Sequence, residues 1–191
     1  MDMEILTYGN KILKQNSEPV QTMTPKLQEL ITRMAGTMYK SKGVGLAAPQ
    51  VGQLIRAVVL DVDQIRTEEN PKPQQRLQVF INPEILEDSK EDSPYTEGCL
   101  SIPGVEGKVF RPKTVRLRFR NEDFKEREIA AEGLLARVIQ HELDHLNGIL
   151  FVDRLSFTQR ALIAGKLSRL RKQNQSGKKS GKSGETHGLI I

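Results

Sequence analysis

Residues 141–145 of the chain, His-Glu-Leu-Asp-His, place two histidines four positions apart with a glutamate beside the first. On an α-helix this spacing brings both imidazoles to one face, where they can bind the same metal ion. The adjacent acid, Glu142, is then close enough to act as a general base on a water molecule. The pattern predicts a metal site on a helix; the alternative is a solvated helix that carries two incidental histidines.

The residues around this motif favour the metal site. On a helical wheel, the His-Glu-His set shares its face with the apolar residues Leu134, Leu135, Val138, Ile139 and Leu146. The opposite side carries the polar residues Arg137, Gln140, Asp144 and Asn147. Two histidines and a glutamate directed into an apolar core are costly unless they are paired or bind a metal.

Two histidines alone do not complete a catalytic metal site, which usually has three protein ligands and one open position. In metzincins a third histidine follows six residues after the second, but Phe151 occupies that position here. After His145 the only acidic residues are Asp153 and Glu185. We therefore expect the third ligand to lie upstream of the motif, and Cys99 is the strongest candidate.

Cys99 is the only cysteine of the chain and stands in the segment Glu-Gly-Cys-Leu-Ser over residues 97–101. The preceding Gly98 permits a close approach of the backbone, and a thiolate is a good metal ligand. Taken alone, the residue is equally consistent with a buried structural cysteine. A single cysteine also excludes an intramolecular disulfide, which favours the reducing environment of the cytoplasm.

Length and charge indicate how the chain is organised. The 191 residues suit one domain, and no apolar run approaches the ~20 residues of a membrane span. Of the net charge of +5, residues 171–191 supply +4, so the rest of the chain is nearly neutral. We predict a single catalytic domain over residues 1–172, then a flexible, basic, low-complexity tail over residues 173–191, with no membrane partner.

The elements that must position these residues read as an α+β fold, because several strands are followed by helices without regular alternation. A helix begins after Thr24 and runs to about residue 39, and another begins at Ser156 and runs to about residue 172. The remaining predicted elements are strands over 55–61, 77–83 and 114–120, and the metal-binding helix over 134–146. Exposed polar segments are predicted over 64–76 and 84–97.

Three segments resemble the signature motifs of peptide deformylases and occur in the same order. They are residues 43–50 (Gly-Val-Gly-Leu-Ala-Ala-Pro-Gln), residues 97–101, and residues 140–145 (Gln-His-Glu-Leu-Asp-His). The similarity extends from about residue 5 to residue 172 and is to the bacterial type with a helical C-terminus. It implies small antiparallel β-sheets packed around a central metal-binding helix, followed by a C-terminal helix.

The resemblance also implies a chemistry. Cys99, His141 and His145 would bind one divalent metal ion, physiologically Fe²⁺, although ligand chemistry alone also permits Zn²⁺, Ni²⁺ or Co²⁺. Glu142 would take a proton from a metal-activated water and deliver it to the leaving amine. The implied substrate is the N-formyl group on the initiating methionine of a newly made polypeptide, and formate is released.

Further residue roles follow from the same resemblance. The Gln50 side-chain amide and the Leu100 backbone N–H would stabilise the oxyanion; outside the motif, Gln50 would be an ordinary polar residue at the entry of a strand. Gly45 would offer backbone hydrogen bonds to an extended peptide. The methionine pocket is assigned to Val44, Leu134 and Val138, which would look the same as plain core residues.

Three other functions compete with this one. A zinc endopeptidase would use the same histidines but needs a downstream third ligand, and a cysteine hydrolase with Cys99 as nucleophile leaves Glu142 unexplained. A non-enzymatic protein that binds RNA or the ribosome would explain the basic C-terminus. Residues 154–172 hold six basic residues and no acid, so ribosome docking through the C-terminal helix and tail is predicted as an added function.

Overall fold

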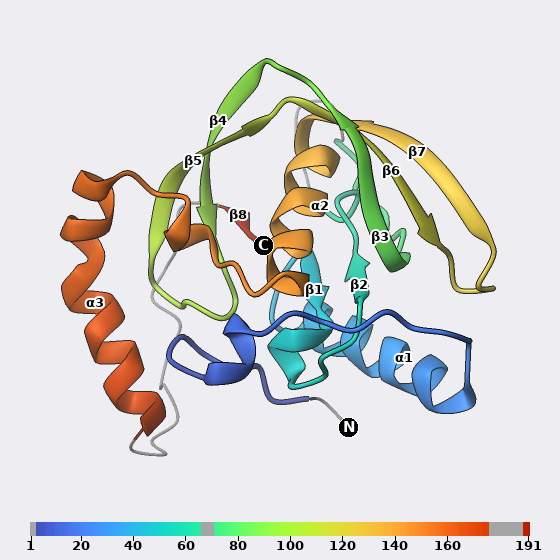
Figure 1. Ribbon diagram of the computed structural model, residues 1–191, viewed down its shortest axis with the longest axis horizontal. Helices are drawn as coiled ribbons and strands as arrows, with labels where there is room; N and C mark the ends of the chain where they lie inside the picture. The colour runs from blue at the N-terminus through green and yellow to red at the C-terminus, as the bar shows by residue number, and fades with distance from the viewer. Residues whose placement is uncertain (1–2, 66–70, 176–188) are drawn as a thin grey trace.

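The structure, a computed structural model, describes residues 3–65, 71–175 and 189–191 (Figure 1). These residues form the predicted α+β fold. The α-helices are α1 (Pro25–Lys40), α2 (Gly133–Leu146) and α3 (Phe157–Gln175), and the 3₁₀ helices are η1 (Lys11–Lys14), η2 (Ala48–Val51) and η3 (Phe151–Asp153). Among the described residues, no helix combines the length and the apolar character needed to cross a membrane.

Two β-sheets flank α2. The larger is antiparallel, in the order β1-β2-β3-β6-β7, with strands Gly45–Ala47, Ala57–Leu60, Gln78–Asp88, Thr114–Arg120 and Glu126–Glu132. The smaller has the order β5-β4-β8, with strands Glu106–Pro112, Asp92–Gly98 and Leu189–Ile190, and β8 runs parallel to β4. In Figure 1, α2 stands between the two sheets. This arrangement places the predicted metal-binding helix at the centre of the fold.

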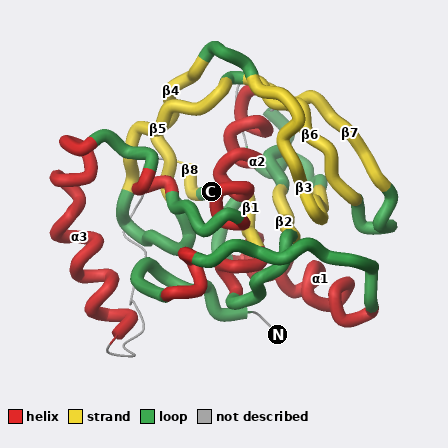
Figure 2. Tube along the Cα trace, viewed as in Figure 1, coloured by secondary structure: helices red, strands yellow, loops and turns green. Residues whose placement is uncertain are grey.

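The starts of α1 and α3 follow from their capping residues. Thr24 accepts a hydrogen bond from the Leu27 N–H at 3.2 Å, and Ser156 accepts one from the Gln159 N–H at 3.3 Å. Each bond satisfies a donor that the first helical turn leaves without a partner. Figure 2 shows α3 at one edge of the molecule, apart from the helix-and-sheet core.

Cross-strand ion pairs extend β3 beyond the end predicted at residue 83. Glu84 pairs with Arg118 at 2.9 Å and Glu87 pairs with Arg116 at 2.5 Å, both on the neighbouring β6. Opposite charges facing each other across two strands stabilise the pairing. The prediction that the acid-rich segment is exposed is confirmed for these two glutamates and is wrong for Glu97, which is fully buried.

Both sides of α2 are buried, including the polar side that the helical wheel separates from the histidines. All residues from Ala136 to Leu146 are buried, because one side packs on the larger sheet and the other faces β4 and β5. Gln140 donates from its amide to the Pro112 carbonyl at 2.9 Å. A helix that is covered all round needs partners for every polar side chain it carries.

A buried ionic network supplies those partners. The Arg111 guanidinium, on β5, donates two hydrogen bonds to Glu97 on β4, at 2.7 and 2.9 Å, and one to Asp144 on α2 at 2.7 Å. Arg137 adds a bond to Glu97 at 3.0 Å, and Arg154 pairs with Asp144. Removing charges from water is costly, and this bidentate geometry is the kind that offsets the cost.

The structure differs from the predicted tail over residues 173–191 at both ends. The last helix continues to Gln175, and Asn174 donates a hydrogen bond to the Thr7 carbonyl at 2.8 Å. Residues 189–191 lie against β4, where Ile191 is fully buried. The low-complexity composition predicted an unordered segment. Pairing with β4 nevertheless gives the backbone N–H and C=O groups of residues 189–191 hydrogen-bond partners, and this does not require the segment to form a large apolar core of its own. Residues 176–188 and 66–70 lie outside the described residues.

We expect replacement of Arg111 with Met to destabilise the folded protein by about 3–5 kcal/mol, because Glu97 and Asp144 would stay buried without their shared partner. Urea unfolding followed by circular dichroism measures this loss. The matched control is Arg118→Met in the exposed pair with Glu84, which should change the free energy of unfolding little. Equal losses in the two variants would contradict a stabilising role of the buried network.

Candidate metal centre

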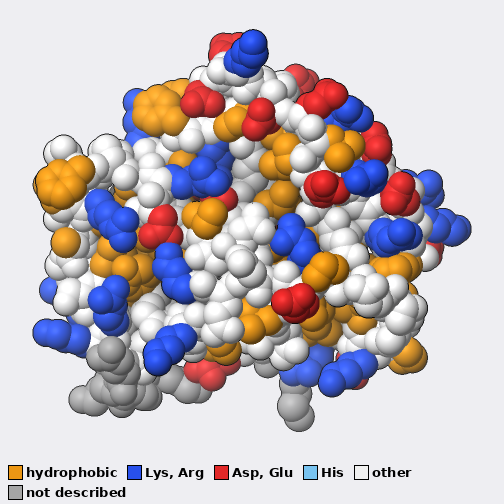
Figure 3. Space-filling model, in the orientation of Figure 1, with side chains coloured by type: hydrophobic (Ala, Val, Ile, Leu, Met, Phe, Trp, Pro, Cys, Tyr) orange, Lys and Arg blue, Asp and Glu red, His pale blue; other side chains and the backbone are white. Residues whose placement is uncertain are grey.

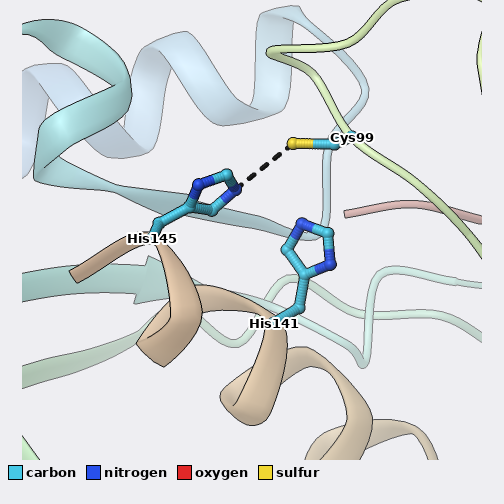
Figure 4. A group of neighbouring side chains, drawn as sticks. All are labelled: Cys99, His141 and His145. Carbon is cyan, nitrogen blue, oxygen red and sulfur yellow. Dashed lines mark hydrogen bonds between the residues drawn. The ribbon is translucent and has the colours of Figure 1, made fainter. Parts of the chain in front are cut away.

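The structure brings together the three residues that the sequence nominated as metal ligands. One candidate ligand atom from each of Cys99, His141 and His145 lies within 4.8 Å of the other two, and all three residues are buried. The Cys99 sulfur is 3.2 Å from Nε2 of His145. Figure 4 shows both imidazoles projecting from α2 toward the sulfur, which enters from the end of β4. Chain segments more than 40 positions apart thus converge on one point.

The two histidines lie on one face of α2, as their four-residue spacing predicts, because α2 is a continuous α-helix through residues 141–145. One helical turn separates them, and their ring centroids are 5.0 Å apart. Cys99 follows the last residue of β4, and its carbonyl accepts a hydrogen bond from the Ile102 N–H at 2.9 Å. This turn holds the cysteine backbone in place as the chain leaves the strand.

The donor set fits a divalent metal ion. Nδ1 of His141 lies 2.9 Å from a Glu97 oxygen, while its Nε2 has no hydrogen-bond partner in the part of the chain that the structure describes. The same holds for both Glu142 oxygens. Buried polar atoms without partners are rare and mark places where an ion or a ligand belongs. A histidine oriented by a carboxylate through one nitrogen presents the other to a metal.

Burial also sets the protonation states that the centre needs. Burial lowers the pKa of His145 well below its usual range, and the neighbouring His141 and Arg111 lower it further, so a neutral ring is favoured. Burial raises the pKa of the Cys99 thiol, and hydrogen bonds from Ser101 only partly oppose this. A thiolate therefore requires a cation beside it here, as in metal ligation.

Glu97 remains ionised although it is buried. Burial alone would raise its pKa, but the hydrogen bonds from Arg111 and His141 outweigh that effect and hold the pKa well below its usual range. Sequence reasoning included Glu97 only as part of a motif and gave it no role. It did not single out Arg111, and it placed Asp144 on the polar side of the helix, because a charged side chain gives no local signal of burial.

Glu142 lies beside the ligands with a carboxylate that water does not reach. Burial raises its pKa well above the usual range, and the Arg111 charge only partly counteracts this. The carboxylate packs against β1 at Gly45, where a Cβ atom would overlap its Oε1. Position 45 therefore requires glycine, and the raised pKa lets the Glu142 carboxyl group hold a proton more readily than an exposed one does.

Gln50, on η2, points its amide nitrogen at the same centre. Its Oε1 accepts a hydrogen bond from the Ala47 N–H at 2.8 Å, which fixes the orientation of the amide. Its Nε2 then lies 3.6 Å from the Cys99 sulfur and 3.3 Å from the Ser101 hydroxyl. A preoriented donor therefore faces the region between the ligands.

The remaining predicted residues belong to one apolar cluster or to the turn that follows β4. Val44 and Val138 are buried in one apolar cluster, and the half-buried Leu134 packs against it. The Leu100 N–H follows Cys99 directly and donates a hydrogen bond to the Ile191 carbonyl at 3.1 Å. The presence of residues 189–191 at this position was not foreseen from the sequence.

The geometry counts against two of the competing functions. A nucleophilic cysteine needs an accessible thiol with a low pKa, whereas Cys99 is buried and its pKa is raised. A zinc endopeptidase would need a downstream ligand, but Asp153 is engaged with Lys14 and with the Leu150 N–H at 2.9 Å. The Cys-His-His set is the metal-binding group found among the described residues.

Comparison with known proteins identifies the family of the chain. The family model described as "Polypeptide deformylase" matches residues 2–161. The chain is 47% identical over 167 residues to a peptide deformylase of Salinibacter ruber (85% of each chain), and 44% identical over 174 residues to one of Mesorhizobium japonicum (91% of this chain, 96% of the relative).

Solved structures give the same result. A peptide deformylase of Plasmodium falciparum superposes with a TM-score of 0.82 at 36% identity, covering 90% of this chain and 97% of that one. One from Legionella pneumophila gives a TM-score of 0.80 at 39% identity, covering 93% and 99%. On the family match, these relatives and the shared fold, the chain belongs to the polypeptide deformylase family, the metal-dependent hydrolases that remove the N-formyl group from nascent peptides.

Proposed function

We propose that Cys99, His141 and His145 hold one divalent metal ion at which this chain hydrolyses the N-formyl group of formyl-methionyl peptides. The observation that carries the proposal is the convergence of these three ligand atoms beside the unpartnered, buried carboxylate of Glu142. We take Fe²⁺ as the physiological ion, with Zn²⁺, Ni²⁺ or Co²⁺ as substitutes that the same ligands accept. When bound, the ion would lower the pKa of a coordinated water towards ~7.

Glu142 is the proton carrier in this proposal. Its carboxylate accepts a proton as water adds to the formyl carbon, and it returns that proton to the nitrogen when the C–N bond breaks. The products are formate and a peptide with a free α-amine. Burial supports the assignment, because a raised pKa brings the carboxyl group closer to the working pH.

Two donors stabilise the negative charge that develops on the formyl oxygen. The Gln50 amide is held in place by the Ala47 N–H, and the Leu100 N–H belongs to the rigid turn after β4. Donors fixed in a dry site stabilise such a charge without reorganising during the reaction. Gly45 offers its backbone to the extended peptide.

The methionine side chain would enter the apolar cluster beside the ligands. We assign Val44, Leu134 and Val138 to its walls, since all three belong to or pack against one cluster that adjoins α2 and β1. An unbranched, polarizable side chain suits a pocket of this composition.

We expect Glu142→Gln to keep the metal and to lower kcat by about 10²- to 10⁴-fold, because the amide cannot carry the proton. Elemental analysis measures the metal content, and formate release from a formyl-Met tripeptide measures the rate. Glu122→Gln, the same change on an exposed turn residue, should leave both unchanged. Near-normal turnover by Glu142→Gln would exclude the proposed role.

The Fe²⁺-loaded enzyme should lose activity in air over hours, because the ion and the Cys99 sulfur can both be oxidised. The Ni²⁺-loaded enzyme should remain active, since Ni²⁺ resists that oxidation. Activity is compared with aliquots of both forms that are kept under nitrogen. Full retention of activity by the iron form in air would contradict Fe²⁺ as the functional ion.

We further propose that α3 docks on the ribosome, where formylated chains emerge, and that the protein works in the cytoplasm. Lysine and arginine side chains gather over α3 in Figure 3. Lys166, Arg169 and Lys172 are exposed at three-residue spacing and so share one helical face. Arg154 and Arg171 contribute less, since they contact Asp144 and Tyr8.

Changing Lys166, Arg169 and Lys172 together to Gln should abolish co-sedimentation with ribosomes at low salt, because phosphate contacts supply most of such binding. The wild-type interaction should also weaken steeply as salt rises. Activity on short formyl peptides should be retained, since none of the three residues lies at the metal centre.

The control variant changes Lys26, Lys42 and Lys90 to Gln, which removes the same charge from exposed positions away from α3. It should co-sediment like the wild type. If both triple variants lose binding equally, net charge rather than the α3 face is responsible, and the docking proposal is wrong.

A further inference from the structure

Residues 189–191 occupy the edge of β4 that leads to the metal centre. Glu97 pairs with Leu189 and Gly98 with Ile190 in parallel register. The Ile191 N–H donates to the Gly98 carbonyl at 3.2 Å. Figures 1 and 2 show β8 beside β4, on the side that faces α2. The segment thus forms an added strand on an otherwise open edge.

The last hydrogen bond of this strand uses a catalytic group. The Ile191 carbonyl accepts from the Leu100 N–H, the donor that we assign to the formyl oxygen. A backbone N–H makes one good hydrogen bond at a time. Residues 189–191 and a formyl peptide therefore cannot both use Leu100.

The Ile191 side chain lies in the apolar cluster to which we assign the methionine pocket. It is fully buried, and it belongs to the same apolar cluster as Val44 and Val138. A branched aliphatic side chain in this cluster excludes a second one, because protein interiors have little free volume.

Strand direction distinguishes the segment from a substrate. It runs parallel to β4, which ends just before Cys99, so the C-terminal end of the segment is the end nearest the ligands. A formyl peptide must place its N-terminal end at the ligands, and it would run the opposite way along the same edge. The segment therefore occupies the edge without presenting a formyl group to Glu142.

We propose that residues 189–191 are an intramolecular competitor of the substrate, held on the β4 edge by Gly98 and Leu100. The proposal rests on the proposed function for the identity of the ligand that is displaced. An attached segment competes at an effective concentration of the order of mM, so even a weak contact has an effect. The structure contains the occupied form, in which residues 189–191 must leave the β4 edge before substrate binds.

Removal of residues 189–191 from the metal-loaded enzyme should lower KM for a formyl-Met tripeptide at least about twofold, because apparent affinity scales with the fraction of open sites. The value of kcat should be unchanged. Binding of the deformylated product tripeptide, measured by calorimetry, should tighten by the same factor. An unchanged KM and an unchanged product affinity would overturn the competition.

Amide hydrogen exchange at Leu100 tests occupancy without relying on activity. In the full chain this N–H should exchange slowly, and in the truncated chain at least about twofold faster, because its acceptor is gone. Equal exchange in both would show that the segment does not dock, which overturns the proposal. If neither chain releases formate, the proposed function fails, while exchange and product binding still decide whether the edge is occupied.

Ile191→Asp supplies a second variant with the full chain length, since a carboxylate is disfavoured in the apolar cluster. It should reproduce the lower KM. The matched control is Leu162→Asp on the exposed face of α3, which should behave like the wild type. A free peptide of residues 184–191 should restore competitive inhibition of the truncated enzyme, and a failure to compete even at mM concentration would contradict docking on this edge.

Discussion

The Glu97 carboxylate connects the parts of the molecule that must stay in register for the centre to exist. It accepts hydrogen bonds from Arg111 on β5, from Arg137 on α2 and from Nδ1 of His141, while its own backbone belongs to β4. A buried carboxylate is tolerable only when such partners surround it. The two sheet strands and the helix are therefore fixed relative to each other by one charge.

That fixed arrangement explains the electrostatic character of the site. Burial keeps His145 neutral, disfavours a free Cys99 thiolate and raises the pKa of Glu142. A cation between the ligands would stabilise the thiolate and leave the carboxyl group of Glu142 as the group that exchanges protons. The exclusion of water from the site would also strengthen the electrostatic interactions between such a cation and its ligands.

The strand β4 pairs with β5 along one edge and with β8 along the other. An open strand edge attracts any segment that can pair with it, including one from the same chain. Here residues 189–191 pair with that edge through backbone hydrogen bonds, and the Ile191 side chain is buried. Under the competition that we propose, substrate access to the Leu100 N–H depends on whether residues 189–191 are paired with β4.

Local signals in the sequence were sufficient for the helices α1, α2 and α3 and for the strands β2, β3 and β6, but not for β4 and β5. Thr24 and Ser156 mark helix starts, alternation marks β6, and the four-residue histidine spacing identifies α2, because each depends on neighbours a few positions away. The three motifs also sufficed to nominate Cys99, Gln50 and the pocket residues.

Tertiary structure alone decided which polar residues are buried and what covers the β4 edge. Arg111 and Asp144 look like surface residues along the chain, yet both lie in the core, because their partners come from different elements. The composition of the C-terminal segment gave no indication that Ile191 would be buried, because its pairing depends on the edge of β4, which is far away in the sequence. A pattern read over neighbouring residues contains no information about contacts between distant segments, and the sequence by itself therefore could not predict these pairings.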